Sequence, residues 1–153
     1  LLDAALKSTL AKPGLQMVER EFGLLELHSE SVDSVKDAGQ SILAACGLSA
    51  SDRIRPSVVS SKIISKVNPY QAQQINKTRK GALLLPGKTL LVMEVEPAAN
   101  IVLAANAAEK ASEIQLVHFN PFGRFGRLFI SGTESEVRAA SEAAHAAVSA
   151  NAG

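Results

Sequence analysis

The residues of this chain that could do chemistry are few, and the first candidate is a possible phosphate site. Residues 82–89 (ALLLPGKT) fit a relaxed phosphate-loop pattern, in which a flexible loop cradles phosphates and a lysine binds them. Such a site needs small residues before the lysine and a helix after it. Here three leucines and a proline precede Lys88, and the following LLVMEVE is typical of a strand. The pattern therefore predicts a turn between strands and not a nucleotide site.

The histidines and the cysteine show no metal-binding or catalytic spacing. His28, His118 and His145 lie far apart in the sequence, and isolated histidines of this kind are usually structural or solvated. Cys46 is the only cysteine, which excludes an internal disulfide and a cysteine-built zinc site. We expect its thiol to lie in the core as a small apolar group. No nucleophile with a base and no carboxylate pair is visible, so we predict no enzyme, no metal and no cofactor.

One loop combines unusual residue types. Residues 120–126 (NPFGRFG) place Arg124 between Phe122 and Phe125 on a frame of two glycines. Proline and glycine exclude regular structure here, so a hairpin turn explains part of the composition. A hairpin in a monomer gives no reason for two aromatic rings beside an arginine, whereas a pore built from symmetric copies does.

Composition and charge exclude several classes of function. Apolar residues make up 46% of the 153 residues and aromatic residues 4%. The net charge is +1, with 16 basic and 15 acidic residues well mixed, which argues against a nucleic-acid surface. No apolar run approaches the roughly 18 residues of a membrane span, and no export signal is visible. We therefore expect a cytoplasmic protein with no nucleic-acid or membrane partner.

The elements that must position the loop follow from hydrophobic period and capping signals. Residues 133–148 begin with Thr133 as an N-cap and Glu136 at capping-box spacing, which predicts a helix rich in alanine. The other predicted elements of this half are strands over 90–96, 114–119 and 127–131 and a helix over 98–111.

The first half repeats this order at a spacing of about 100 residues. It shows a helix over 2–10, strands over 15–21 and 22–28, and a helix over 31–46 that Gly47 ends. The first half has no counterpart of the strand over 90–96, so we expect this module to be incomplete at its N-terminus. Between the halves, the pattern predicts a helical stretch over 57–67 and a loop or frayed helix end over 71–81.

This repeat resembles the tandem bacterial microcompartment shell domain. The matching stretches are DAALKS, AANAAEKASEIQLV and FISGTESEVRAASEAAHAAV, and RIRPSV with VSSKIIS is similar to the segment linking the two domains in shell proteins of propanediol and ethanolamine compartments. The resemblance implies an α/β (α+β) fold of two ferredoxin-like modules with mainly antiparallel sheets. Residues 1–50 would form the first module, 51–89 a connector and insert, and 90–153 the second module.

The resemblance also implies a function and a set of sites. Such proteins form trimers, pseudo-hexameric tiles that pack edge to edge with other shell proteins around encapsulated enzymes. The tile edge would then carry Lys7, Lys110 and Arg55, although the asparagine that often lies three residues beyond the lysine is replaced here by Leu10 or Glu113. The central pore would be lined by Asn120, Phe122, Gly123, Arg124, Phe125 and Gly126.

Two alternatives stay open at this point. The phenylalanines would either narrow the pore or brace its loop. The alternative function is a regulatory module that binds small molecules between paired βαβ-type repeats.

The first module lacks the pore cysteine through which some relatives hold an iron–sulfur cluster, so no cluster is expected.

Overall fold

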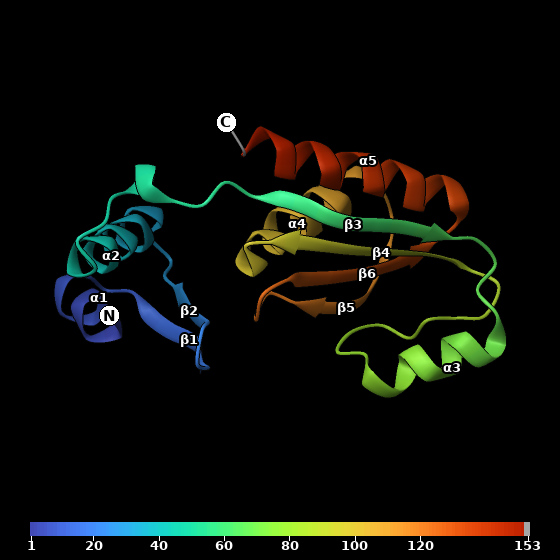
Figure 1. Ribbon diagram of the computed structural model, residues 1–153, viewed down its shortest axis with the longest axis horizontal. Coiled ribbons are helices and arrows are strands. Elements are labelled where there is room, and N and C mark those ends of the chain that lie inside the picture. The colour runs from blue at the N-terminus through green and yellow to red at the C-terminus, as the bar shows by residue number, and fades with distance from the viewer. Residues whose placement is uncertain (152–153) are drawn as a thin grey trace. The chain divides into compact units, whose positions relative to one another are not determined.

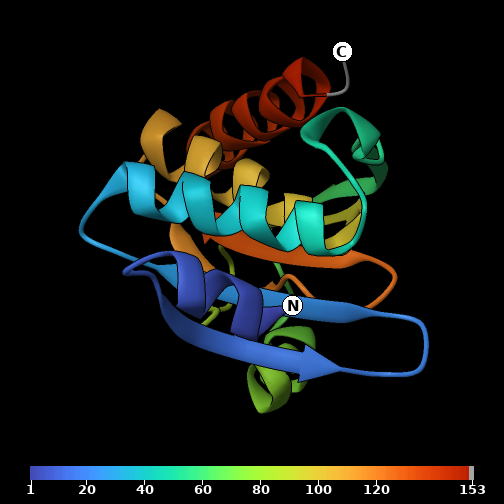
Figure 2. The same ribbon diagram turned by 90° about the vertical axis from the view of Figure 1, so that its left-hand side faces the viewer.

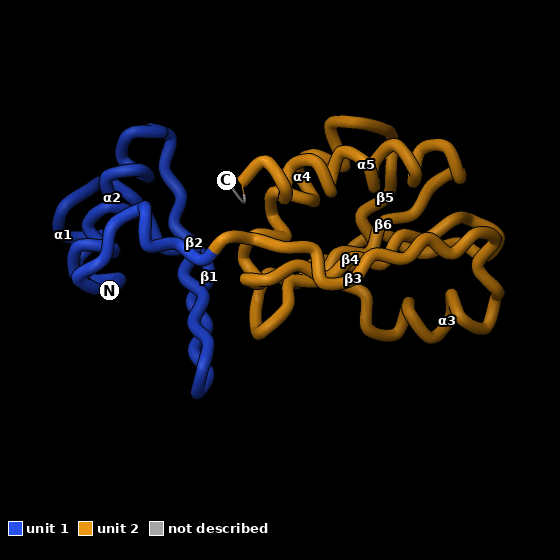
Figure 3. Tube along the Cα trace, turned by 45° about the horizontal axis from the view of Figure 1, so that its top comes forward, with its two compact units in different colours: residues 1–54 blue, residues 55–153 orange. Residues whose placement is uncertain are grey.

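The computed structural model describes residues 1–151, which divide into two compact units, Leu1–Ile54 (unit 1) and the residues from Arg55 onward (unit 2; Figure 3). Unit 1 consists of α1 (Leu2–Ser8), β1 (Lys12–Val18), β2 (Gly23–His28), α2 (Val32–Ala45) and a short 3-10 turn, η1 (Ala50–Asp52). Unit 2 consists of β3 (Ser57–Ile64), α3 (Pro69–Thr78), β4 (Thr89–Glu96), η2 (Ala98–Asn100), α4 (Ile101–Ala111), β5 (Gln115–Asn120), β6 (Gly126–Gly132) and α5 (Glu134–Ala150).

Unit 2 is built on a four-stranded antiparallel sheet with the strand order β3-β4-β6-β5. Helices α4 and α5 cover one face of this sheet and α3 lies on the other (Figure 1). The main core lies under α4 and α5, where Leu91 pairs with Ile130 and Met93 pairs with Leu128 across β4 and β6. The helices contribute mostly alanines to this core, so their backbones can approach the sheet closely.

The beginning of α5 confirms the predicted capping box. The side chain of Thr133 accepts a hydrogen bond from the backbone N–H of Glu136, and the carboxylate of Glu136 accepts one from the backbone N–H of Thr133. These bonds satisfy donors that the first turn of a helix otherwise leaves free. The helix therefore starts at the residue that the sequence indicates.

Unit 1 is smaller, and its core is formed by small side chains. Its two helices lie beside the β1–β2 hairpin (Figure 2). The buried apolar residues are the alanines Ala5, Ala11 and Ala38, with Leu27 and Ile42 packed against them. The order helix, strand, strand, helix is the same as that of α4, β5, β6 and α5, which confirms the predicted repeat.

Three expectations from the sequence are wrong. The predicted helix over 57–67 is strand β3, because its β-branched residues fit an edge position beside β4 from Ser57 to Ile64. The segment over 71–81, predicted as a loop or a frayed helix end, forms most of the regular helix α3, which Asn68 caps and Pro69 opens at the first helical position. Cys46 is exposed at the C-cap of α2 and does not lie in a core.

The first two corrections change how unit 2 is bounded. The segment 51–89 was expected to be a connector and insert. Within it, β3 is an edge strand of the sheet of unit 2, and α3 packs against one face of that sheet. In residues 1–151, none of the helices is both long and apolar enough to cross a membrane.

Candidate functional site

The loop between β5 and β6 is a short, internally bonded connection. Strand β5 ends at Asn120 and β6 begins at Gly126. The side-chain amide of Asn120 donates a hydrogen bond to the carbonyl oxygen of Phe122 at 3.2 Å. Gly123 has φ +95°, a conformation that side chains other than glycine rarely adopt, so glycine is required at the turn. The loop thus holds a defined shape with few residues.

The two phenylalanines of the loop have different surroundings. Phe122 is only 9% exposed, so its ring lies largely out of solvent. Phe125 is half-buried, and the guanidinium carbon of Arg124 lies 5.3 Å from the centroid of its ring. This distance is within the range of a cation–π contact. Arg124 itself is exposed, so the loop presents a positive charge that an aromatic ring supports from one side.

Gly126 is buried, and the reason for its small size lies within the chain. A Cβ at this position would collide with the backbone carbonyl oxygen of Ala98 and would lie 2.7 Å from the Cβ of Ile101. The resemblance predicts that Gly126 lines the pore. The structure assigns it a local function, which is to let the start of β6 pass under η2 and the beginning of α4.

The strands behind the loop carry one ion pair and one partly buried histidine. Nε of Arg127 lies 2.8 Å from Oε1 of Glu94 on the neighbouring strand. The ring of His118 lies 5.3 Å from that of Phe129. Burial lowers the pKa of His118 below its usual value, and the positive charges of Lys80 and Arg127 lower it further. A hydrogen bond to the backbone of Thr78 acts in the opposite direction and raises this pKa. His118 packs against an aromatic ring, as expected for a structural histidine.

The three predicted edge residues are exposed side chains. Lys7 lies in the last turn of α1, where its Nζ is 2.7 Å from the carboxylate of Asp3. Lys110 lies in the last turn of α4, one residue before the end of the helix, as Lys7 does in α1. Arg55 is exposed beside the buried Pro56 at the beginning of unit 2. The lysines are therefore equivalent in both units, which is the geometric basis for treating them together.

Sequence reasoning missed a turn that is equivalent to the 120–126 loop. In unit 1, β1 and β2 are joined by residues 19–22, where the backbone N–H of Glu19 donates to the carbonyl oxygen of Phe22 at 2.8 Å. Glu19, Arg20 and Glu21 are exposed on this turn, and Phe22 is half-buried. The internal repeat could have revealed this turn, because β1 and β2 correspond to β5 and β6 in the order of elements. The turn is short and lacks the proline and glycines that mark the other loop.

Residues 82–89 show no phosphate-site geometry. Gly87 adopts φ +80° in a turn, and strand β4 begins at Thr89 where a phosphate loop would require a helix. The segment forms a turn as predicted, but it joins helix α3 to strand β4 and does not join two strands. Among the described residues 1–151, no group of three or more His, Cys, Asp or Glu side chains is arranged to hold a metal ion.

Comparison with known proteins identifies relatives for both halves. The CsoS1D N-terminal domain family matches residues 1–52, and the BMC domain family matches residues 89–153. The carboxysome shell protein CcmP of Synechococcus elongatus is 47% identical over 148 residues, which cover 97% of this chain and 70% of CcmP. The carboxysome shell protein CsoS1D of Hydrogenovibrio crunogenus is 39% identical over 149 residues, which cover 97% of this chain and 73% of that protein.

Solved structures show the same likeness. The fused permuted hexameric shell protein MSM0275 from the RMM microcompartment has a TM-score of 0.92 at 41% identity, covering 99% of this chain and 76% of its own. The double-ringed trimeric shell protein MSM0271 from the same microcompartment has a TM-score of 0.92 at 39% identity, covering 97% and 74%. These relatives support a structural role and give no support to the regulatory alternative. The chain belongs to the bacterial microcompartment shell proteins and is a structural component of a microcompartment shell.

Proposed function

We propose that this chain is a non-catalytic shell tile that assembles as a trimer with a central pore. The observation that carries the proposal is the 47% identity to a carboxysome shell protein along 97% of the chain. The two units repeat one order of elements, so three chains would supply six similar sectors of a ring. A closed ring satisfies every head-to-tail interface between such sectors. One related structure is itself described as a trimeric shell protein.

The pore in this proposal is lined by the turns that join equivalent strands. Arg124 would contribute three positive charges, since guanidinium groups stay protonated in proteins. Because the turn over 19–22 is the equivalent of the loop over 120–126, Arg20 and its two neighbouring glutamates would alternate with Arg124 around the ring. A ring of charges raises the local concentration of oppositely charged metabolites. Phe122 is 9% exposed and would offer less of its ring to the pore than the half-buried Phe125.

The outer edge of the tile would carry Lys7, Lys110 and Arg55. All three side chains are exposed, and the lysines occupy equivalent helix ends. Contacts of this kind would join the tile to other shell proteins around the encapsulated enzymes. The relatives come from carboxysomes and from the RMM microcompartment, so they support a shell role in common and do not select one compartment.

The proposal is tested by measuring mass and assembly together. Light scattering at micromolar concentration should give three times the 16.1 kDa mass of the chain. Electron microscopy of concentrated protein should then show flat sheets with hexagonal spacing. A stable monomer or dimer would overturn the trimer, and a trimer that never forms sheets, alone or with other shell proteins, would overturn the tile.

A further inference from the structure

The turn that follows α3 is fastened to the outer edge of β5. The backbone N–H groups of Gly81 and Ala82 donate hydrogen bonds to the carbonyl oxygens of Val117 and Leu116, at 3.0 and 2.7 Å. The strand order places β5 at one edge of the sheet, so within residues 1–151 no other strand pairs with its outer side. Residues 78–82 therefore cover part of an edge that would otherwise be open to association.

His118 is a further attachment between this turn and the sheet. Its ring is partly buried and contacts that of Phe129 on β6, with the ring centroids 5.3 Å apart. A hydrogen bond joins the ring to the backbone of Thr78, the last residue of α3. One face of the sheet and the end of α3 thus meet at a single imidazole, beside the backbone bonds of the turn.

The charges that face His118 are mainly positive. Burial lowers the pKa of its ring most, and Lys80 from the turn and Arg127 from β6 lower it further. On β4, the carboxylate of Glu94 is engaged by Arg127, with 2.8 Å between Oε1 and Nε. The rest of β5 has no titratable side chain, and the segment before Lys80 adds two more exposed cations, Lys77 and Arg79. A proton on His118 would therefore enter a place that is already positive.

We propose that His118 is an acid-sensitive clamp, which holds residues 78–82 against β5 while it is neutral and releases them when it takes up a proton. The neutral ring packs on Phe129 without adding a charge. The imidazolium would be repelled by Lys80 and Arg127, and it would lose hydration in its partly buried place. Leaving that place removes both penalties, because the charged ring is then solvated.

The released segment has a defined limit. The side-chain amide of Asn76 donates to the carbonyl oxygen of Leu84 and accepts from the backbone N–H of the same residue, both at 2.9 Å. None of these groups titrates, so acid leaves this attachment in place. Residues 78–82 would open as a short loop between Asn76 and Leu84. Because β5 ends at Asn120, the uncovered edge belongs to the strand that leads into the loop over 120–126.

The direction of the pH dependence follows from linkage between proton binding and opening. When the turn is released and the ring is solvated, the pKa of His118 returns to its ordinary value of 6.5, above that of the closed state. The clamp is therefore complete above this value, and it weakens as the pH falls through the lower pKa of the closed state. The full loss equals the ratio of the proton affinities of the open and closed ring.

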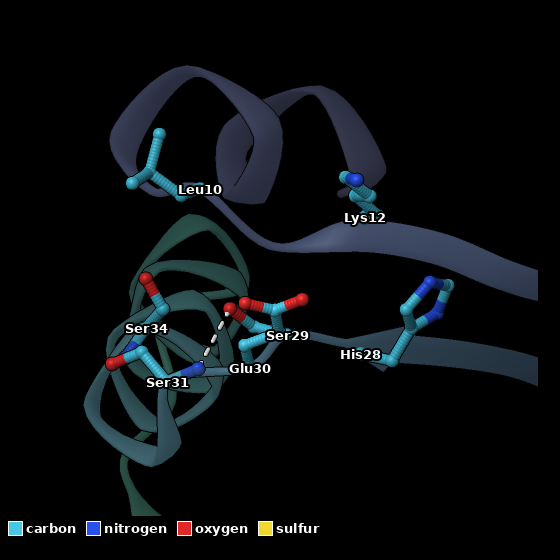
Figure 4. A pocket seen from close by; sticks show the side chains of 7 residues that line it. All are labelled: Leu10, Lys12, His28, Ser29, Glu30, Ser31 and Ser34. Carbon is cyan, nitrogen blue, oxygen red and sulfur yellow. Dashed lines mark hydrogen bonds between the residues drawn. The ribbon is translucent and has the colours of Figure 1, made fainter.

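His28 of unit 1 provides a matched histidine without a clamp. Its side chain is exposed and stands beside Lys12 on the wall of a hollow in unit 1 (Figure 4). Among the residues that the structure describes, His28 makes no contact with an aromatic ring. A substitution there changes a titrating group near a lysine and leaves the turn over 78–82 untouched.

Hydrogen exchange of the intact chain at about pH 8 and about pH 5, corrected for intrinsic exchange rates, tests the clamp. The protection of the N–H groups of Gly81 and Ala82 should fall at the lower pH. The fall should match the factor calculated from the pKa of His118 in an NMR titration of its ring. The N–H of Leu84 and those at the centre of β4 should keep their protection, because their bonds do not depend on the clamp.

His118→Gln should abolish the acid response of the turn, whereas His28→Gln should retain it. Lys80→Gln changes an exposed side chain and guards against misfolding of the first variant. It should raise the pKa of His118 and reduce the response, and Lys77→Gln, three residues earlier, should do neither. Unchanged protection at the lower pH, an equal loss at Leu84, or a response that survives in His118→Gln would overturn the proposal. An unaltered response in Lys80→Gln would exclude the repulsion on which it depends.

Discussion

Replacing Gly126 with alanine should destabilise the fold of unit 2, and the size of the effect follows from the geometry. The added methyl group would collide with the carbonyl oxygen of Ala98 and lie 2.7 and 2.9 Å from Cβ and Cγ2 of Ile101. The carbonyl is backbone and Ile101 is fully buried, so neither can move aside freely. Overpacking of this kind costs about 1–3 kcal/mol, which corresponds to a fall in Tm of roughly 2–12 °C for a chain of this size.

Urea and thermal unfolding of Gly126→Ala measure this effect, with Gly39→Ala as the control. Gly39 lies in α2 with no atom within 4 Å of an added Cβ, so alanine there should stabilise its helix by up to about 1 kcal/mol. If Gly126→Ala unfolds like the wild type and changes only assembly or permeation, the glycine serves contacts between copies. That result would refute the explanation by packing within the chain.

Four further perturbations have expected outcomes. Thr133→Ala should lower the free energy of unfolding by about 1 kcal/mol in urea, because Glu136 loses its cap acceptor, and an unchanged midpoint would contradict this. Glu136→Gln should destabilise the protein more at about pH 7 than at about pH 3. The hydrogen bond from the backbone N–H of Thr133 lowers the pKa of the Glu136 carboxyl below 4.5. The charged carboxylate therefore stabilises the fold above pH 4.5, and this contribution is lost as the pH falls through the folded pKa. An equal loss of stability at both pH values would show that the charge of Glu136 does not contribute. Lys7→Ala combined with Lys110→Ala should keep the trimer but raise the concentration needed to form sheets, and sheets at the wild-type concentration would remove both from the edge. Arg124→Glu should slow the passage of anionic metabolites into assembled shells but not of neutral ones, less so in high salt, and equal effects on both would place Arg124 away from the path.

Local signals in the sequence were sufficient for elements whose causes lie within a few residues. The cap and the alanine-rich pattern after Thr133 predicted α5, because the bonds that start a helix join residues three apart. The alternation over 127–131 predicted β6, and its partner β4 followed from an aliphatic run. The repeat of the two halves could also be read directly, because it compares one local pattern with another.

The tertiary structure decided the features that depend on distant residues. Residues 57–64 carry β-branched side chains that several conformations tolerate, and pairing with β4 makes them an edge strand. Gly126 became a point of close contact only when β6 passed under Ala98 and Ile101. The turn over 19–22 is recognised as the counterpart of the 120–126 loop because β1 and β2 pair as β5 and β6 do in the other unit. Period and capping act within one turn or strand, whereas burial and strand pairing join residues tens of positions apart, and those long-range contacts determine which loop residues are free to face another molecule.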